Sequence, residues 1–314
     1  MRRALLLLGL LSGSALGEPQ VLLAPSVGGP MRLTASGRVL KTRPSERHGA
    51  LGQNLRRLTA SQWPGATVQL RFGDLAASVE ADGEGDFHFT FRAPEGQPFP
   101  AGWTALSASV RGASTTTRAL VLAPDAPFLL VSDFDDTVAV TGVTSPTQLL
   151  RSTLAADAVT QPAVPGMADF YQCLAARAPA PGFALVSGSP IQYLGRVERF
   201  LDLKRFPPMA LELRRLGLGT LSGYKPPVLR RLLEEVPAPV VLVGDSGEKD
   251  PEVYRQLALE FPGRVKATYI RQVGPPSPPE RFEGQVLFES AAEAARDAAR
   301  RGLADPACVA QRFQ

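Results

Sequence analysis

The hydrophobic pattern of the chain changes character near residue 124. Before this point, short segments of alternating apolar and polar residues are separated by Gly, Pro and Asp, which is typical of half-buried β-strands. We expect strands at residues 31–40, 66–72, 76–81, 87–91, 104–111 and 116–121. About six such strands predict a small β-sandwich-like domain, with a hairpin turn at residues 81–85. Residues 43–63 break the pattern and are expected to form either a helix at 49–58 or a mobile loop.

Beyond residue 127, mostly apolar runs alternate with segments whose apolar residues recur every three or four positions. The runs lie at residues 128–132, 183–186, 209–213, 240–243 and 265–270, and the expected helices at 167–177, 191–203, 226–235, 251–261 and 290–301. This alternation predicts a parallel sheet, and strands that are apolar throughout are buried by helices on both faces of the sheet. We therefore expect a sandwich-like domain over residues 18–126 and an α/β domain over residues 127–314.

The N-terminal segment has the layout of a secretory signal. Residues 1–3 carry two arginines, residues 4–16 are mostly apolar, and the small residues Ala15 and Gly17 lie where a cleavage site is expected. An uncleaved membrane anchor is the alternative, but the apolar run is shorter than the roughly 20 residues that span a bilayer. We expect residues 1–17 to be a signal peptide and the mature protein to be exported to the periplasm or the extracellular medium.

Composition adds three constraints. With 44% hydrophobic and 20% charged residues, the 314-residue chain has ordinary globular composition. The net charge of +4 comes from basic residues that are spread along the chain, so nucleic-acid binding is not favoured. Cys173 and Cys308 are the only cysteines, and in an exported chain they can pair, although Cys173 lies in an apolar helical pattern that suits a buried free thiol equally well.

Polar residues follow four of the expected parallel strands directly. Asp133 and Asp135 belong to the stretch 132–137, Ser-Asp-Phe-Asp-Asp-Thr, at the end of the first strand. An isolated stretch of this kind is equally well a solvated acidic turn. Here, however, Ser187 follows the second strand in the stretch 187–189, and Lys225 begins a helix after the third strand. Asp245 and Asp250 follow the fourth strand in the stretch 244–250. Carboxyl ends of parallel strands share one edge of a sheet, so these groups meet, as in haloacid dehalogenase-like phosphotransferases.

Physical chemistry assigns a role to each group. Asp133 is placed to attack phosphorus, and Asp135 to protonate the leaving oxygen and later to deprotonate water. Crowded carboxylates repel one another unless a cation intervenes, so we expect Mg²⁺ bound by Asp133, Asp245 and the main-chain carbonyl of Asp135, with Asp250 as a supporting residue of the metal site. Ser187 is expected to bind a phosphoryl oxygen and Lys225 to offset the transition-state charge, while residues 136–137 shape the loop.

These stretches resemble the catalytic domain of the actin-patch-associated phosphatidate phosphatases, a branch of the haloacid dehalogenase superfamily. The resemblance is carried by the stretches 132–138, 186–190, 224–225, 243–254, 261–265 and 269–271, of which 243–254, ending in Asp-Pro-Glu-Val-Tyr, is the most specific. It implies Mg²⁺-dependent hydrolysis of phosphatidate to diacylglycerol. Two positions near the substrate depart from the family, which usually has His where Tyr224 stands and an aromatic residue at Ile191.

The segments 139–165 and 190–224 are too short for a large cap domain, so we expect an open site. An open site admits bulky or membrane-bound phosphoesters. Leu149, Leu150, Leu154 and Val159 form either a lipid-gripping face on a short helix, with peripheral membrane contact, or simply a packed helix. Three hypotheses follow: a phosphatidate phosphatase, an exported phosphatase for another phosphomonoester, and, least favoured, a non-catalytic binding module.

Overall fold

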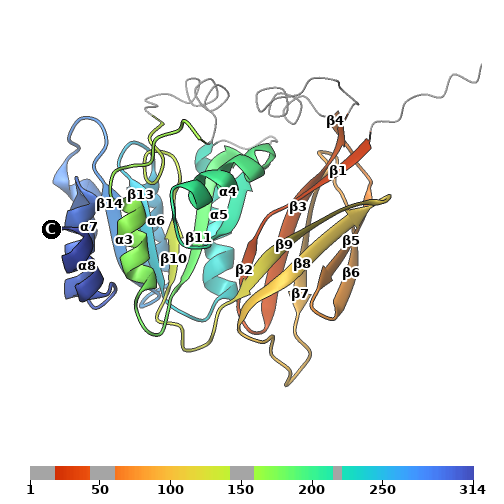
Figure 1. The fold of residues 1–314 in the computed structure, drawn as a ribbon, viewed down its shortest axis with the longest axis horizontal. Coiled ribbons are helices and arrows are strands. Elements are labelled where there is room, and N and C mark those ends of the chain that lie inside the picture. Colours follow the sequence, from red (N-terminus) through yellow and green to blue (C-terminus); the bar gives the residue numbers. More distant parts are fainter. Residues whose placement is uncertain (1–17, 43–60, 142–158, 215–220) are drawn as a thin grey trace, which may run out of the picture.

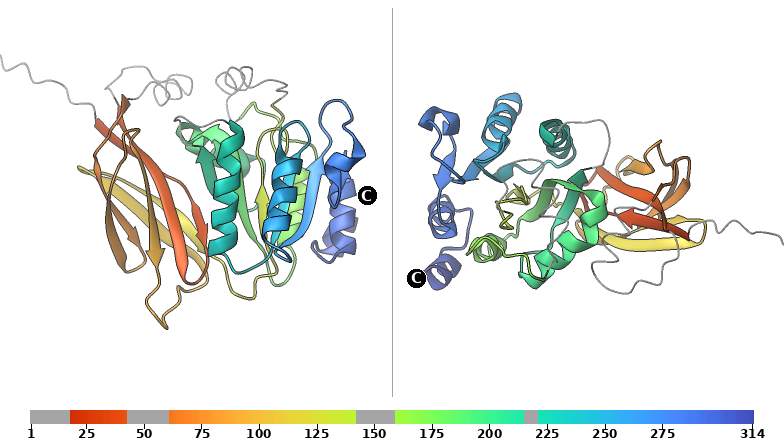
Figure 2. Two further views of the ribbon diagram at one scale, coloured as in Figure 1. Left: turned by 180° about the vertical axis from the view of Figure 1, so that it is seen from behind. Right: turned by 90° about the horizontal axis from the view of Figure 1, so that it is seen from above.

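The computed structural model describes residues 18–42, 61–141, 159–214 and 221–314. Within these ranges a nine-stranded sheet occupies the N-terminal part and a six-stranded sheet the C-terminal part. Figures 1 and 2 show the two sheets side by side, with the helices gathered around the six-stranded one. The first sheet ends at Val121 and the second begins at Leu129, so the predicted boundary after residue 126 lies in the segment between them.

The N-terminal sheet contains the six strands that the alternating pattern predicted, each within a few residues. They are β3 (Arg32–Thr42), β5 (Thr67–Phe72), β6 (Leu75–Glu80), β7 (Asp86–Arg92), β8 (Gly102–Val110) and β9 (Ala113–Val121). The structure adds β1 (Glu18–Leu23), β2 (Ser26–Gly28) and β4 (Ser61–Gln62). Strands β2 and β4 were not predicted because they are too short for an alternating pattern to show. Strand β1 was not predicted because its first three residues, Glu-Pro-Gln, are followed by three apolar residues rather than alternating with them.

The strands fall into two layers. Strand β3 pairs with β1, β4 and β7, whereas β2, β9, β8, β5 and β6 follow one another as neighbours, and the short pairing of β2 with β3 joins the two sets. One buried cluster contains Leu33, Val39 and Phe87 from the first set together with Leu70 and Leu106 from the second. Because side chains of both sets share this core, the sets pack face to face. The N-terminal part is therefore an antiparallel, sandwich-like β region.

The turn at residues 81–85 is present, but the prediction of a hairpin there is wrong. Strand β6 pairs with β5, and β7 pairs with β3, so the turn carries the chain from one layer to the other. The side chain of Asp82 closes the turn by accepting hydrogen bonds from the main-chain amides of Glu84 and Asp86, both at 2.9 Å. A turn of this composition stabilises a tight reversal, and it does not by itself determine which strands pair.

The C-terminal sheet is parallel throughout, with the strand order β12-β11-β10-β13-β14-β15. Its strands are β10 (Leu129–Ser132), β11 (Gly182–Pro190), β12 (Ala210–Arg214), β13 (Val240–Asp245), β14 (Val265–Arg271) and β15 (Val286–Phe288). The helices are α3 (Met167–Ala175), α4 (Leu194–Leu203), α5 (Leu221–Glu235), α6 (Asp250–Glu260), α7 (Ala291–Arg300) and α8 (Pro306–Arg312), with short 3₁₀ turns η1 (Ile191–Tyr193) and η2 (Pro279–Phe282).

Two buried clusters lie on opposite faces of this sheet. One packs residues of α3, α4 and α7 against Leu130 and Val243, and the other packs residues of α5 and α6 against Val131 and Leu242. Neighbouring residues on a strand point to opposite faces, so helices cover both faces. The predicted parallel α/β fold is confirmed at this level.

One helix begins earlier than the sequence indicated. Lys225 does not begin a helix, because α5 starts at Leu221 and contains Lys225, Pro226 and Pro227. Proline is most often found in the first turn, which placed the predicted start too late. A proline ring has a helical φ and removes one amide donor, so prolines in the second turn cost the helix only bonds close to its amino end.

The sandwich-like region covers the edge strand β12 and the helix α5. The main-chain amide of Leu211 in β12 donates a hydrogen bond of 2.7 Å to the carbonyl oxygen of Pro25. Thr34 Oγ1 lies 2.5 Å from Glu235 Oε1 at the end of α5. Approach is so close at Gly29 that a β-carbon there would lie 2.2 Å from the carbonyl oxygen of Glu235. An unpaired edge of the parallel sheet is thus protected by the N-terminal strands.

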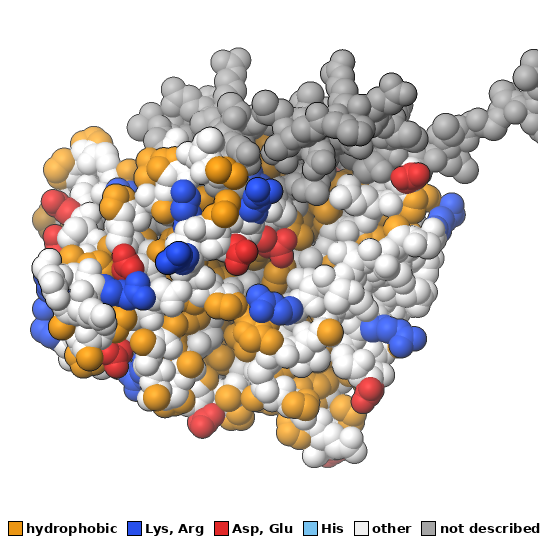
Figure 3. Space-filling model, viewed as in Figure 1, with side chains coloured by type: hydrophobic (Ala, Val, Ile, Leu, Met, Phe, Trp, Pro, Cys, Tyr) orange, Lys and Arg blue, Asp and Glu red, His pale blue; other side chains and the backbone are white. Residues whose placement is uncertain are grey.

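Several predictions fall on residues outside the described ranges: the signal peptide at 1–17, the helix or loop at 49–58, and the apolar positions Leu149, Leu150 and Leu154. Of that group Val159 is described, and it is exposed. None of the helices in the described ranges combines the length and apolar character needed to cross a membrane. On the face drawn in Figure 3, Lys and Arg side chains are scattered rather than gathered into one patch.

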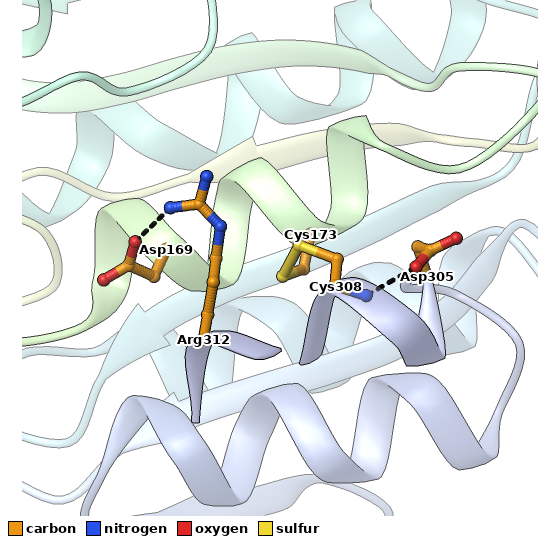
Figure 4. Close-up of a disulfide and its surroundings, with 5 residues drawn as sticks. All are labelled: Asp169, Cys173, Asp305, Cys308 and Arg312. Carbon is orange, nitrogen blue, oxygen red and sulfur yellow. Dashed lines mark hydrogen bonds and ion pairs between the residues drawn. A yellow bond between two sulfur atoms is a disulfide. The ribbon is translucent and has the colours of Figure 1, made fainter. Parts of the chain in front are cut away.

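The two cysteines form a disulfide in the structure. Cys173 in α3 and Cys308 in α8 are joined, with their Cα atoms 5.3 Å apart. Figure 4 shows the bond beside the ion pair of Asp169 and Arg312, which links the same two helices, and beside Asp305, whose side chain accepts from the amide of Cys308. The last helix is therefore attached covalently to the helix that packs over the centre of the sheet.

We predict that reduction of this disulfide lowers the stability of the C-terminal domain without abolishing its fold. The bond closes a loop of 135 residues, and a crosslink of this kind contributes about 2–5 kcal/mol by restricting the unfolded chain. The melting temperature of the wild-type protein should fall when a reductant is added. The melting temperature of Cys308→Ser should already be lower without reductant. Two titratable free thiols in the untreated native protein would contradict the bond.

Candidate active site

The predicted site residues meet at the carboxyl edge of the parallel sheet. Strand β10 lies between β11 and β13, so Asp133, which directly follows β10, is flanked by Ser187 on β11 and Asp245 at the end of β13. The amide of Asp133 donates to the carbonyl oxygen of Val243 at 2.8 Å, which fixes its place beside β13. All three side chains are buried. The sheet topology therefore brings together residues that are more than a hundred positions apart.

Lys225 lies at the centre of the acidic cluster. Its Nζ atom is 2.6 Å from Asp250 Oδ1 and 2.9 Å from Asp133 Oδ1, and it also lies 3.3 Å from Glu248 Oε2. Asp133, Asp245 and Asp250 each offer a carboxylate oxygen within 4.8 Å of the others. A buried lysine that touches two buried carboxylates holds the cluster together, but it cannot balance all of its negative charge.

Burial together with this excess of negative charge shifts the pKa values of Asp133, Asp245 and Lys225. Burial raises the pKa of Asp133 well above its usual value, and the attraction of Lys225 offsets this only in part. Burial also raises the pKa of Asp245 to about 7, and repulsion from Asp250 adds to the shift. For Lys225, burial alone would lower the pKa, but Asp133 and Asp250 raise it well above its usual value. The site therefore favours any additional positive charge.

Asp135 lies apart from Lys225, beside the two serines of β11. The hydroxyl of Ser189 donates to Asp135 Oδ2 at 3.3 Å, and that of Ser187 lies 3.5 Å from the same oxygen. Burial raises the pKa of Asp135 to about 6, and repulsion from Glu248 adds to the shift. A carboxyl group with this pKa exchanges a proton readily near neutral pH, which is what general acid and base catalysis requires.

Two glycines allow the fourth motif to close around Asp245. A β-carbon at Gly244 would lie 2.4 Å from Asp250 Oδ2, so the carboxylate of Asp250 reaches the cluster only because residue 244 lacks a side chain. The amide of Gly247 donates a 2.6 Å hydrogen bond to Asp245 Oδ1. These contacts explain the glycines of the stretch 244–250, which sequence reasoning used only as part of a motif.

The donor set suits a hard cation. Asp245 Oδ2 and Asp135 Oδ1 are buried and have no hydrogen-bond partner among the residues that the structure describes. Carboxylate oxygens are the ligands that Mg²⁺ prefers, and a divalent cation would supply the positive charge that Lys225 alone cannot. The buried acidic cluster that was predicted is present, and it includes Asp250 as well as Asp133 and Asp245.

Sequence reasoning overlooked three contacts in this site. Ser189 approaches Asp135 more closely than Ser187 does, and Glu248 joins the lysine network from an exposed position. Thr137, which was expected only to shape the loop, has its hydroxyl 3.4 Å from Asp133 Oδ2. The available signal was position, because Ser189 and Glu248 belong to the same motif stretches as the residues that were assigned.

A buried carboxylate cluster with one lysine at the carboxyl edge of a parallel sheet is an arrangement that suits phosphoryl transfer. Residues 128–272, which include all six predicted site residues, match the family described as "Phosphatidate phosphatase APP1, catalytic domain". This segment is similar to the catalytic domain of that family, and the resemblance inferred from the motifs is confirmed. The homology supports a phosphoric monoester hydrolase.

Two fungal proteins are similar over the same part of the chain. The sequence is 31% identical over 150 residues to phosphatidate phosphatase APP1 of Saccharomyces cerevisiae and 30% identical over 153 residues to the uncharacterized protein C29B5.04c of Schizosaccharomyces pombe. The alignments cover 45% and 46% of this chain and 25% of each relative. The chain therefore spans about a quarter of the length of the curated relatives that it matches.

Solved structures align only loosely. DsGPDH of Dunaliella salina aligns with a TM-score of 0.37 at 19% identity, over 52% of this chain and 28% of that protein. XAC1771, a carbohydrate acetylesterase from Xanthomonas citri, aligns with a TM-score of 0.34 at 14% identity, over 92% of this chain and 67% of that protein.

We predict that Lys225→Met destabilises the C-terminal domain when no divalent cation is present. The substitution leaves the carboxylates of Asp133 and Asp250 buried without their counter-charge, and breaking a buried ion pair in this way costs about 3–5 kcal/mol. Thermal unfolding in excess chelator measures the loss. Adding Asp250→Asn in the Lys225→Met background should recover part of it, and an unchanged melting temperature in Lys225→Met would contradict the central place of this lysine.

Proposed function

We propose that this protein is a Mg²⁺-dependent phosphomonoester hydrolase with a haloacid dehalogenase-like catalytic domain, and that phosphatidate is its substrate. The observation that carries the proposal is the buried contact of Lys225 with Asp133 and Asp250, with Asp245 in the same cluster. This constellation lies inside the segment that matches the phosphatidate phosphatase family. The match to one fungal relative that carries this activity supports the choice of substrate.

The first step transfers the phosphoryl group to the enzyme. An oxygen of Asp133 attacks phosphorus, the bond from phosphorus to the ester oxygen breaks, and the carboxyl proton of Asp135 passes to that oxygen to release an alcohol. The pKa of Asp135, raised by burial to about 6, keeps part of this group protonated near neutral pH. Lys225 faces the attacking carboxylate and offsets negative charge as it moves onto the phosphoryl oxygens.

The second step restores the enzyme. The carboxylate of Asp135 removes a proton from water, the resulting hydroxide oxygen attacks phosphorus, and the bond between phosphorus and Asp133 breaks to give inorganic phosphate. The hydroxyl of Ser187, 3.5 Å from Asp135 Oδ2, is placed beside the acid and base group, where it can also donate to a phosphoryl oxygen. Covalent transfer divides one slow hydrolysis into two easier steps.

Asp133, Asp245 and the main-chain carbonyl of Asp135 would hold Mg²⁺, with Asp250 supporting them. When bound, the cation supplies electrostatic stabilisation for the charge of the phosphoryl group. The orphaned oxygen of Asp245 and the excess negative charge of the cluster support this assignment. Lys225 already contacts Asp133 and Asp250 from one side, so a cation would complete the neutralisation of these carboxylates.

A bulky lipid substrate fits the described parts of the site. Between the second and third motifs the described residues form only η1, α4 and β12, with no cap domain among them. Ile191 in η1 and Tyr224 in α5 line one cleft together with Leu213 and Val228. The rest of its lining includes the polar and charged residues Thr34, Ser36, His88, Glu212 and Arg231. The apolar part of this cleft is compatible with a lipid leaving group, which would be reached by peripheral contact with a membrane.

We also propose that the protein works outside the cytoplasm. The signal-like residues 1–17 motivate this location, and the disulfide between Cys173 and Cys308 supports it, because disulfides persist mainly in oxidising compartments. Phosphatidate would then be met at a membrane surface that faces this compartment.

The proposal is tested by phosphate release from short-chain phosphatidate in mixed micelles, with sugar phosphates, nucleotides and phosphopeptides in parallel. We predict preference for the micellar lipid, dependence on Mg²⁺ and loss of activity in excess EDTA. Preference for a soluble ester would keep the chemistry and replace the substrate. Full activity in EDTA would contradict the metal assignment.

Asp133→Asn is the matched variant for this assay. The amide keeps the size of the side chain but cannot act as the nucleophile. General acid and base catalysis contributes about 10²–10⁴-fold to a rate, and the loss of the nucleophile should lower turnover by more than this factor. Its melting temperature should equal or exceed that of the wild type, because the substitution removes one of several mutually repelling buried carboxylates. Normal turnover by a correctly folded Asp133→Asn protein would refute the mechanism.

A further inference from the structure

Two arginines outside the motif stretches donate hydrogen bonds to main-chain carbonyls inside them. Arg281 belongs to the turn η2, and Arg214 is the last residue of the strand β12. Neither was assigned a role from the sequence, and neither side chain directly contacts a carboxylate of the acidic cluster in the contacts that the structure describes. Each instead donates to a peptide group whose opposite side faces a site residue. Arg281 donates in addition to the main-chain carbonyl oxygen of Glu248.

Arg281 acts on the peptide between Ser246 and Gly247. Its Nη1 atom donates to the carbonyl oxygen of Ser246 at 2.5 Å. The amide of the same peptide, at Gly247, donates to Asp245 Oδ1 at 2.6 Å. Arg281 is itself oriented by Glu252, since Nε lies 2.6 Å from Glu252 Oε1. The guanidinium, the peptide and the metal-site carboxylate therefore form one continuous chain of hydrogen bonds.

Arg214 repeats this arrangement on the second motif. Its Nε atom donates to the carbonyl oxygen of Gly188 at 3.0 Å. The amide of the same peptide, at Ser189, donates to Ser187 Oγ at 3.0 Å. Arg214 is placed for this by the register of the sheet, in which it pairs with Pro190 of the neighbouring strand. The lone pair of Ser187 that accepts this bond is thus occupied, which leaves its hydroxyl proton available to an acceptor.

The geometry of a trans peptide explains why both arginines contact the carbonyl side. The carbonyl and the amide of one trans peptide point in opposite directions, so a guanidinium that fixes the carbonyl also fixes the direction of the amide. A charged donor on the carbonyl oxygen polarises the peptide and strengthens the hydrogen bond that its amide makes. At Gly247 the polarised amide meets a carboxylate, and at Ser189 it meets a hydroxyl oxygen.

We propose that Arg281 and Arg214 are positioning residues that act through these two peptides, Arg281 on the metal-site carboxylate Asp245 and Arg214 on the phosphate-binding hydroxyl of Ser187. The proposal deepens the proposed function and rests on its assignment of those two residues. The two arginines act on different ligands, because Asp245 would bind Mg²⁺ and Ser187 would bind the phosphoryl group. Their loss therefore produces two separable defects.

The test uses Arg281→Met and Arg214→Met in the full chain, with two binding measurements that need no turnover. Thermal stabilisation by Mg²⁺ reports the metal site, and calorimetric binding of inorganic phosphate in saturating Mg²⁺ reports the phosphate site. Outer partners of metal ligands typically contribute 10–100-fold to affinity, so Arg281→Met should weaken the Mg²⁺ effect by about that factor. Arg214→Met should leave the Mg²⁺ effect unchanged and weaken phosphate binding by about tenfold.

Arg264→Met is the matched control. Arg264 also donates to main-chain carbonyls, those of Val236 at 2.6 Å and Ala238 at 3.1 Å, but these lie at the amino end of β13, away from the site. This variant should show the wild-type response to Mg²⁺ and to phosphate whatever its melting temperature. Arg281→Lys and Arg214→Lys, which keep a cationic donor, should recover part of each loss, as a positioning role requires.

The outcomes separate this proposal from the proposed function. If the wild type binds Mg²⁺ and phosphate and both methionine variants bind them equally well, the positioning roles are wrong. If both variants lose both ligands together, and the lysine variants recover neither, the arginines only maintain the fold. If the wild type binds both ligands, and Arg281→Met and Arg214→Met show the two separate defects, but the wild type hydrolyses no phosphoester, the positioning roles stand and the proposed function fails.

Discussion

The site depends on one electrostatic constraint: more negative charge is buried at the carboxyl edge of the sheet than one lysine can balance. Asp133, Asp245 and Asp250 lie within reach of one another, and Lys225 contacts two of them. Burial and the repulsion among these carboxylates raise the pKa values of Asp133 and Asp245. A site of this kind costs the domain stability, and under the proposed function it does so in order to hold a cation and a phosphoryl group, which is a common relation between stability and activity.

Most of the surrounding structure serves to hold this cluster in place. The central strand β10 carries Asp133 between the strands that carry Ser187 and Asp245, and helices on both faces of the sheet exclude water from below the site. Gly244 makes room for Asp250. The sandwich-like region covers the far edge of the sheet and contributes residues to the cleft near Tyr224.

Much of this was predictable because the signals are local. Period-two alternation revealed the longer antiparallel strands, and mostly apolar runs revealed five of the six parallel strands, while β15 has only three residues. Asp133, Ser187 and Asp245 were predictable because they lie at the carboxyl end of a buried strand. Lys225, which lies inside α5, was found from its place in the order of the motif stretches. Other features could not be predicted because they depend on tertiary packing. They are the strand pairing across the turn at residues 81–85, the start of α5, and the contacts of Ser189, Arg214 and Arg281.

Chemical trapping on Asp133 tests the central claim most directly. The full chain would be mixed with short-chain phosphatidate and Mg²⁺, quenched within a turnover, treated with borohydride to convert an aspartyl-phosphate to homoserine, and digested for mass spectrometry. The account predicts homoserine at residue 133, with the neighbouring Asp135 and Asp136 unchanged and no conversion without substrate. Turnover with no conversion at Asp133, or conversion at another carboxylate, would contradict the account.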